Sequence, residues 1–333
     1  MKGSPSSVLS ARPKDREQHS LEQLALIRQF LAARGLSLRD SMFLATQLVH
    51  HGFHEADAVL STLIREVPHA SAKNYFSRLQ RRHAVIQSLP ALKSVLREQP
   101  RMLALYDPAM GSYFIPGSCR ADTAVVVFTT VNNNFGVSNA VFDAMLQDLG
   151  VARLYLKDPS RYTYFRGVAG LSDSLLGLPA AIARLLDHKD IRNTVVTGFS
   201  SGGLPALYTA AVLDASACLA FSTYTDFSKT SALQQPQMYR NISREIDSSQ
   251  RVNTADVIAG SKTPPGSIRI YYGLDHPIDR AHAQRLSGLP QVRLFGIEDC
   301  GHYSATALLD EGALAPAFAE AVDTSLRSVG SVS

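Results

Sequence analysis

Residues 195–203 read VVTGFSSGG, and this stretch decides the fold. Gly198, Ser200 and Gly202 match the pattern G-x-S-x-G, directly after an apolar run and directly before a helical pattern. In a sharp turn from strand to helix, this pattern lifts a serine hydroxyl above the edge of a sheet, and side chains at the flanking glycines would collide with the neighbouring strand and helix. A Gly/Ser turn without a chemical role is the alternative for a bare pentapeptide. The strand and helix on either side favour Ser200 as a nucleophile.

Strand-like apolar runs alternate with helical patterns on both sides of this stretch. Such alternation predicts an α/β fold, in which a mostly parallel sheet has helices on both faces. The expected strands are 102–106, 112–115, 124–129, 153–156, 194–196, 217–221, 268–272 and 292–295. The expected helices are 137–149, 173–186, 203–213, 280–286 and 313–327.

The chain divides into regions of different character. Residues 1–19 are polar and are expected to form a disordered tail. Apolar residues at helical spacing predict a helical extension over 20–99, and Pro100 marks the start of the α/β domain at 100–333. Residues 223–267 interrupt the strand-helix rhythm, at a position where a lid over a substrate pocket would lie.

Within the helical extension, the segment that begins FLATQLVHHG at residue 43 resembles a single helical hairpin of the tetratricopeptide kind. The resemblance rests on small and apolar residues at Ala45, Leu48, Gly52, Ala56, Leu60 and Pro68. A stacked array needs about three such repeats to bury a continuous face. We therefore expect the extension to dock on the main domain or on a protein partner.

A nucleophilic serine needs a base and an acid, which in this kind of fold follow it along the chain. His302 lies on a loop after the last expected strand, in the run VRLFGIEDCGH, and is the candidate base. Asp275 and Asp279 both follow the strand that ends at Gly273. Asp275 is nearer the strand end, whereas Asp279 is in a position to cap a helix that starts near residue 280. The pattern leaves both aspartates open as the acid.

Backbone N–H groups are the candidate donors to a developing oxyanion. The N–H of Ser201 lies at the start of the helix after the nucleophile. Val131 and Asn132, in the loop of VVVFTTVNNNFG, are the candidates for the second donor. The three consecutive asparagines also suit a tight turn, so a purely structural role for their side chains is equally open.

From about residue 100 to its end, the chain resembles α/β-hydrolase fold serine hydrolases. The residues that carry the resemblance are FTTVNNNFG, GFSSGG, the strand end YYG with DRAHA, and DCGHY. More narrowly, they are similar to a branch with acetyltransferase-like proteins of bacterial accessory secretion systems and hydrolase-like proteins of polysaccharide loci. DRAHA favours the later aspartate as the acid, although the spacing from Gly273 departs from the common pattern for both.

The resemblance implies serine-dependent ester hydrolysis or acyl or acetyl transfer, with no cofactor, on a small-molecule, carbohydrate or glycoconjugate ester. A thioesterase or peptidase would use the same three residues. The alternative of another class is a binding or scaffold protein that keeps the fold and acts through its N-terminal helices, because a fold does not by itself establish an activity.

Two other groups of residues were considered as sites, a histidine pair for metal binding and a cysteine for thiol chemistry, and both are weaker candidates than Ser200 with His302. His50 and His54 could share one helix face, but Gly52 lies between them and no further ligands are evident, so we expect no metal. Cys300 is two residues from His302, but a cysteine is commonly a small buried apolar residue.

Composition bounds the remaining possibilities. The formal charge is +4, and its densest basic run, Arg78, Arg81 and Arg82 beside His83, is too short for a nucleic-acid stripe and is expected to be a solvated face. The three cysteines, at 119, 218 and 300, form neither a disulfide framework nor a pair of metal knuckles. No apolar run is long enough for a membrane span or a signal peptide, and we expect a cytoplasmic protein.

Overall fold

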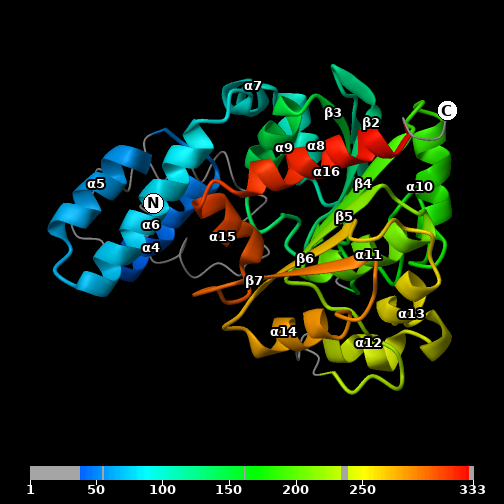
Figure 1. Cartoon of the computed structure of the whole chain (residues 1–333). Helices are drawn as coiled ribbons and strands as arrows, with labels where there is room; N and C mark the ends of the chain where they lie inside the picture. Colours follow the sequence, from blue (N-terminus) through cyan, green and yellow to red (C-terminus); the bar gives the residue numbers. More distant parts are fainter. Residues whose placement is uncertain (1–37, 55, 161, 234–238, 330–333) are drawn as a thin grey trace, which may run out of the picture. The chain divides into compact units, whose positions relative to one another are not determined.

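The computed structural model describes residues 38–54, 56–160, 162–233 and 239–329 (Figure 1). They form two compact units, with the division between Asp107 and Pro108. The tail predicted at 1–19 and the first part of the predicted helical extension lie outside the described residues. Among the helices that are described, none is both long and apolar enough to cross a membrane.

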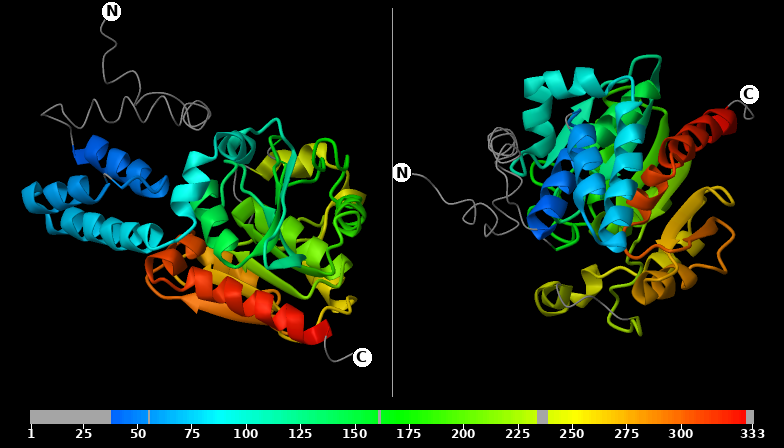
Figure 2. Two further views of the ribbon diagram at one scale, coloured as in Figure 1. Left: turned by 90° about the horizontal axis from the view of Figure 1, so that it is seen from above. Right: turned by 90° about the vertical axis from the view of Figure 1, so that its left-hand side faces the viewer.

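The first unit is helical. Its described helices are α4 (Leu38–His50), α5 (Ala56–Glu66), α6 (Ala70–Gln87), α7 (Leu92–Arg97) and α8 (Gln99–Tyr106). The first three pack against one another and lie side by side in Figure 2. Between α4 and α5, Gly52 has a φ of 72°, a conformation that glycine adopts without strain. Ala45, Leu48, Ala56 and Leu60 are buried, so the small residues of the predicted hairpin lie where the helices meet.

The basic run on α6 divides between the surface and the interior. Arg78 and Arg81 are exposed, as expected of a solvated face. His83 is 4% exposed, and burial lowers its pKa. The run is therefore not a continuous basic surface.

The strand predicted at 102–106 is wrong, because these residues belong to α8. Met, Leu and Ala are strong helix formers, and the apolar run MLALY is short enough to suit either structure. Pro100 lies in the first turn of α8, where proline is tolerated, instead of separating a helical region from a strand. The unit boundary consequently falls after Asp107, later than the predicted start at residue 100.

The second unit is built on a seven-stranded sheet. The strands are β1 (Ser112–Ile115), β2 (Arg120–Phe128), β3 (Val151–Leu156), β4 (Asn193–Phe199), β5 (Ala217–Phe221), β6 (Ile268–Gly273) and β7 (Val292–Ile297). Their order is β1-β3-β2-β4-β5-β6-β7. Only β1 runs antiparallel to its neighbour, and all other pairs are parallel. The predicted α/β fold is confirmed.

Helices cover the sheet on both faces (Figure 1). One layer contains α10 (Leu178–Asp187), α11 (Gly203–Val212) and α13 (Thr254–Ala259), which pack together, and the other contains α9 (Asn139–Asp148) and α16 (Leu314–Val329). Strands covered on both faces need apolar residues on both, and β3, β4 and β5 are buried almost throughout. The edge strand β7 instead alternates between more and less exposed residues.

Outside the lid-like insertion, the second unit differs from the expected helices at three places. The helix predicted from residue 173 begins only at Leu178, after an irregular segment in which Asp158 accepts the backbone N–H of Tyr164 at 2.8 Å. A helix that the periodicity did not predict, α15, spans Ser304–Asp310. The helix predicted from residue 280 is α14 (Pro277–Gln284), which begins with a proline in its first turn.

The segment predicted as a lid-like insertion has more than one role in the fold. It contains α12 (Arg240–Glu245) and also α13, which packs against α11 as part of the helical layer. Its start, residues 223–227, follows the carboxyl end of β5 directly. The function of the segment as a lid stays a prediction.

Candidate active site

The turn that carries Ser200 is forced by the chain around it. Ser200 follows the end of β4, and residues 200–202 form one 3-10 turn that leads into α11. The φ of Ser200 is 54°, in the left-handed region that non-glycine residues seldom adopt. A Cβ on Gly202 would lie 2.2 Å from the carbonyl oxygen of Phe128, and one on Gly198 would lie 2.0 Å from that of Gly202. Glycine is therefore required at both positions for the strand and helix to meet this closely.

His302 faces this serine from the loop after β7. Its Nε2 lies 2.8 Å from the Oγ of Ser200. The loop is held in place by Ser304, whose hydroxyl donates to the carbonyl oxygen of Tyr271 at 3.1 Å and lies 2.8 Å from the hydroxyl of Ser222. The imidazole also packs beside the ring of Phe199, with 5.5 Å between ring centroids.

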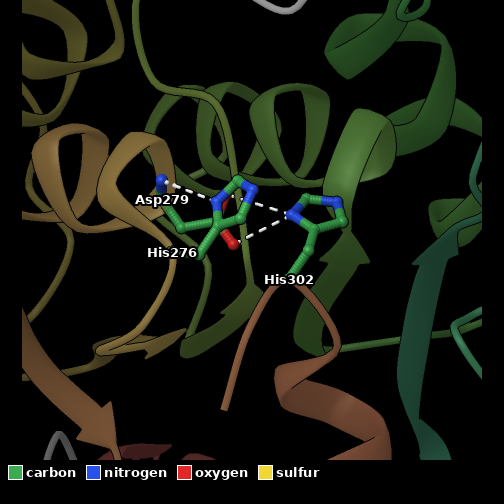
Figure 3. A group of neighbouring side chains, drawn as sticks. All are labelled: His276, Asp279 and His302. Atoms are coloured by element: carbon green, nitrogen blue, oxygen red, sulfur yellow. Dashed lines mark hydrogen bonds and ion pairs between the residues drawn. The ribbon is translucent and has the colours of Figure 1, made fainter.

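The carboxylate behind His302 is that of Asp279. The Nδ1 of His302 lies 2.9 and 3.0 Å from its two oxygens (Figure 3). The side chain of Asp279 is fully buried in the first turn of α14, where the helix dipole favours a negative charge. Asp279 does not cap this helix, since the N-cap is His276, whose Nδ1 accepts the backbone N–H of Asp279 at 3.2 Å. Asp275 instead donates its backbone N–H to the carbonyl oxygen of Cys300 at 3.1 Å.

This arrangement fixes where the protons lie. Because carboxylate oxygens only accept hydrogen bonds, the Nδ1 of His302 carries the proton and its Nε2 is the acceptor. The hydroxyl of Ser200 then donates to Nε2. Ser200, His302 and Asp279 thus form a directed hydrogen-bond chain, in which the imidazole is aligned to take a proton from the serine.

The same carboxylate is shared by a second imidazole. The Nδ1 of His276 lies 2.9 Å from an oxygen of Asp279, and His276, Asp279 and His302 offer ligand atoms within 4.8 Å of one another. Among the residues that the structure describes, this is the one group of three side chains that could hold a metal ion, and it does not include His50 or His54. The Nδ1 of His302 donates to the carboxylate of Asp279, whereas the Nδ1 of His276, which accepts the backbone N–H of Asp279, lies close to the same carboxylate without donating to it (Figure 3).

Cys300 is unsuited to thiol chemistry. It is 5% exposed, and burial, together with the charges of Asp279 and Asp275, raises its pKa to about 11. Its thiol donates to the carbonyl oxygen of Gly301 at 3.3 Å. At neutral pH the group is protonated, and a protonated thiol is a poor nucleophile.

The loop that was expected to supply a second oxyanion donor is tied to its own surroundings. The N–H of Val131 donates to the hydroxyl of Ser201 at 2.9 Å, and the N–H of Asn132 donates to the hydroxyl of Thr130 at 3.2 Å. Ser201 is 1% exposed and lies at the start of the turn into α11. The structure therefore brings Ser201 and Val131 together next to Ser200, with both backbone donors of the loop already engaged.

Two tyrosines near His302 were not predicted. The ring of Tyr224 lies at 27° to that of His302, with 6.1 Å between centroids, and the ring of Tyr239 lies edge-on to that of Tyr224 at 5.1 Å. Both tyrosines are almost fully buried, and burial raises the pKa of Tyr239 to about 12 and that of Tyr224 further. A signal for Tyr224 was available, because it lies on the loop just after β5 and the carboxyl ends of parallel strands meet at one edge of the sheet. Tyr239 lies in the irregular insertion, which offered none.

Comparisons with known proteins give structural likeness alone. No family model matches the sequence, and no curated protein matches it. An esterase/lipase from an uncultured bacterium is 12% identical, with a TM-score of 0.47, over 65% of this chain and 80% of that one. Est1E from Butyrivibrio proteoclasticus is 16% identical, with a TM-score of 0.42, over 64% of this chain and 94% of that one. An α/β hydrolase enzyme from the metagenome of lagoon sediments at Mar Chica, Morocco, is also 16% identical, with a TM-score of 0.42, over 60% and 90%.

At these identities the likeness says nothing about substrate, and the narrower resemblance to the accessory-secretion and polysaccharide-locus branch stays a prediction. The fold itself rests on the topology. A parallel sheet with one antiparallel edge strand, helices on both faces and a serine on a strained turn after β4 make the second unit an α/β-hydrolase fold.

Proposed function

We propose that the chain is a serine-dependent acyl hydrolase that cleaves esters, with Ser200 as nucleophile, His302 as base and Asp279 as the acid behind it. The observation that carries the proposal is the hydrogen-bond chain from the Oγ of Ser200, 2.8 Å from His302, to the buried carboxylate of Asp279. Its three members follow three different strands: Ser200 in the turn after β4, Asp279 in the first turn of α14 after β6, and His302 on the loop after β7. A strained backbone at Ser200 is a further support, since strain of this kind clusters at functional sites.

In the first half of the reaction, the Oγ of Ser200 bonds to the carbonyl carbon of the ester while its proton passes to the Nε2 of His302. The carbonyl π pair moves onto oxygen and forms an oxyanion. Asp279 stays ionised and stabilises the imidazolium through Nδ1. When the oxyanion collapses, the bond to the leaving alkoxide breaks, and that oxygen takes the proton from His302.

In the second half, a water molecule attacks the acyl-enzyme while His302 takes its proton, and Ser200 is regenerated with the release of a carboxylic acid. The hydroxyl of a sugar in place of water would give acyl transfer by the same steps. A carbohydrate or glycoconjugate ester as the natural substrate rests on the sequence resemblance alone and is part of the proposal. So is the helical first unit as a site for a protein partner.

A fluorophosphonate probe tests the nucleophile directly, because the probe labels only an activated serine. We expect the probe to label the full chain. It should also label the control variant Ser201→Ala, which removes the hydroxyl next to the nucleophile that accepts the N–H of Val131 in the wild type. The Ser200→Ala variant should not be labelled, and its kcat for a p-nitrophenyl ester should fall by about four to six orders of magnitude. Ester hydrolysis that survives in Ser200→Ala would refute the proposal. A folded wild-type chain that is never labelled would favour the scaffold alternative.

A further inference from the structure

The buried carboxylate of Asp279 has an imidazole on each of two sides. The Nδ1 of His302 donates to it at 2.9 Å, and the Nδ1 of His276 lies 2.9 Å from an oxygen of the same group. The ion pairs that the structure describes for Asp279 involve these two imidazoles and no lysine or arginine. Within the described part of the chain, this buried negative charge is therefore not paired with a permanent cation.

The contact between His276 and Asp279 brings two acceptors together. The Nδ1 of His276 accepts the backbone N–H of Asp279 at 3.2 Å, so this nitrogen carries a lone pair and no proton. The carboxylate oxygen that lies 2.9 Å away also only accepts. Two electron-rich atoms this close repel each other unless a cation lies between them. A cation bound to both atoms would therefore be stabilised here.

The side chains have the spacing of a metal site. The Nδ1 of His276, the Nδ1 of His302 and a carboxylate oxygen of Asp279 lie within 4.8 Å of one another and converge in Figure 3. Zn²⁺ binds imidazole nitrogen and carboxylate oxygen at about 2.0–2.2 Å, so two ligand atoms of one ion lie roughly 3–4 Å apart. The two separations of 2.9 Å are close to this range, and small rotations of the imidazoles would adjust all three.

The types of ligand atom select the metal. Two imidazoles and one carboxylate suit Zn²⁺, Cu²⁺ or Ni²⁺, whereas Mg²⁺ and Ca²⁺ prefer sets of oxygen atoms. Three protein ligands leave a fourth position of the metal open to water. The side chain of Asp279 is fully buried, but those of His276 and His302 are 30% and 23% exposed, so an ion can enter from the solvent.

We propose that His276, Asp279 and His302 form an inhibitory site for a divalent transition metal such as Zn²⁺. The inference rests on the proposed function, because the metal would switch off that same site. When the ion bonds to the Nδ1 of His302, this nitrogen loses its proton to solvent and Nε2 takes one up, so the imidazole stays a neutral ligand. Nε2 then donates to the Oγ of Ser200, 2.8 Å away, and cannot take its proton. The ion also neutralises the charge of Asp279 that would stabilise an imidazolium.

His276 is the member of this site that the proposed reaction does not use. Its Nδ1 caps α14 through the bond of 3.2 Å, which is the longest of its contacts with Asp279 and the one that a metal ion would replace. Asparagine is a good cap for a helix, but its amide is a poor ligand for Zn²⁺. His276→Asn therefore removes a metal ligand and keeps an acceptor for the backbone N–H of Asp279.

The test is inhibition of p-nitrophenyl ester hydrolysis by ZnCl₂, with each variant compared with its own rate in EDTA. We expect ZnCl₂ to abolish the wild-type rate, EDTA to restore it, and MgCl₂ to have no effect. In His276→Asn, the Zn²⁺ concentration for half inhibition should rise by about 100-fold or more, because even a partner of a metal ligand contributes about 10- to 100-fold to affinity. His54→Asn, which removes an exposed histidine of the first unit, is the matched control and should be inhibited like the wild type.

Binding is measured apart from activity, by isothermal titration calorimetry with ZnCl₂. We expect the wild type to have a site that is lost in both His276→Asn and Asp279→Asn, with thermal unfolding as the check that each variant is folded. The inference would be overturned by a wild type that does not bind Zn²⁺, by binding that leaves the rate unchanged, or by equal inhibition of a folded His276→Asn. Failure of the proposed function is a separate result, because it would appear as ester hydrolysis by Ser200→Ala.

Discussion

Replacement of Asp279 by asparagine separates the two aspartates that the sequence left open. Both oxygens of Asp279 lie within 3.0 Å of the Nδ1 of His302. An asparagine has an NH₂ group in place of one oxygen. If the NH₂ faces His302, it donates to Nδ1 and moves the ring proton to Nε2, where it opposes the hydroxyl of Ser200. If the amide oxygen faces His302, the geometry survives but the charge that stabilises the imidazolium is lost.

The first orientation removes the base and the second destabilises the imidazolium, so we expect kcat to fall by about four orders of magnitude, or about 5 kcal/mol in the barrier. The assay is hydrolysis of a p-nitrophenyl ester under steady-state conditions, with unfolding in urea to check that the variant is folded. Asp275→Asn is the matched control, four residues away, and should keep kcat within about threefold. An equal or larger loss in Asp275→Asn would mean that the acid has been assigned to the wrong residue.

Two further predictions concern other groups. Cys300→Ser should keep the wild-type kcat for ester hydrolysis, because burial and the nearby carboxylates raise the pKa of this thiol to about 11; a loss beyond tenfold would contradict its exclusion from the chemistry. The free energy of unfolding should fall as the pH drops from about 6.5 towards 4, because burial lowers the pKa of His50 to about 3 and that of His51 to about 4 while the unfolded chain takes up these protons near 6.5. Each histidine contributes a slope of up to about 1.4 kcal/mol per pH unit. Urea titrations at pH 7 and pH 5 measure this loss of unfolding free energy, and the loss should be smaller in His50→Gln than in the wild type.

Local patterns predicted the sheet well because its strands are buried on both faces. Continuous β-branched runs such as the one at Val125–Val127 have few alternatives to a central parallel strand. The strand predicted from the run MLALY at 102–106 was wrong because five apolar residues are too few to show a period. Pro100 was no guide either, since a proline fits both a domain boundary and the first turn of a helix. Local composition could not decide between the two.

The sequence predicted those site residues that must lie at a set place relative to a strand or a turn. The turn at Ser200 requires glycine at Gly198 and Gly202, so it can be recognised in the sequence as G-x-S-x-G. The base, His302, could be recognised because it follows the last strand. The choice of Asp279 depends on where α14 begins, and that is decided by Pro277 and by the cap from His276. Tyr224 and Tyr239 pack near His302 from the insertion after β5, where the strand-helix rhythm is interrupted and gives no position for a single side chain.

The three members of the hydrogen-bond chain have an implication for biosynthesis. Ser200 follows β4 near the middle of the sheet, but its base is 102 residues further on and follows β7, the strand that completes the sheet at its edge. A ribosome-bound chain that has emerged only through β5 therefore holds this serine without the imidazole and the carboxylate that align with it in the folded chain. Under the proposed function, competence to cleave esters arises only after the chain through β6, β7 and His302 has been added.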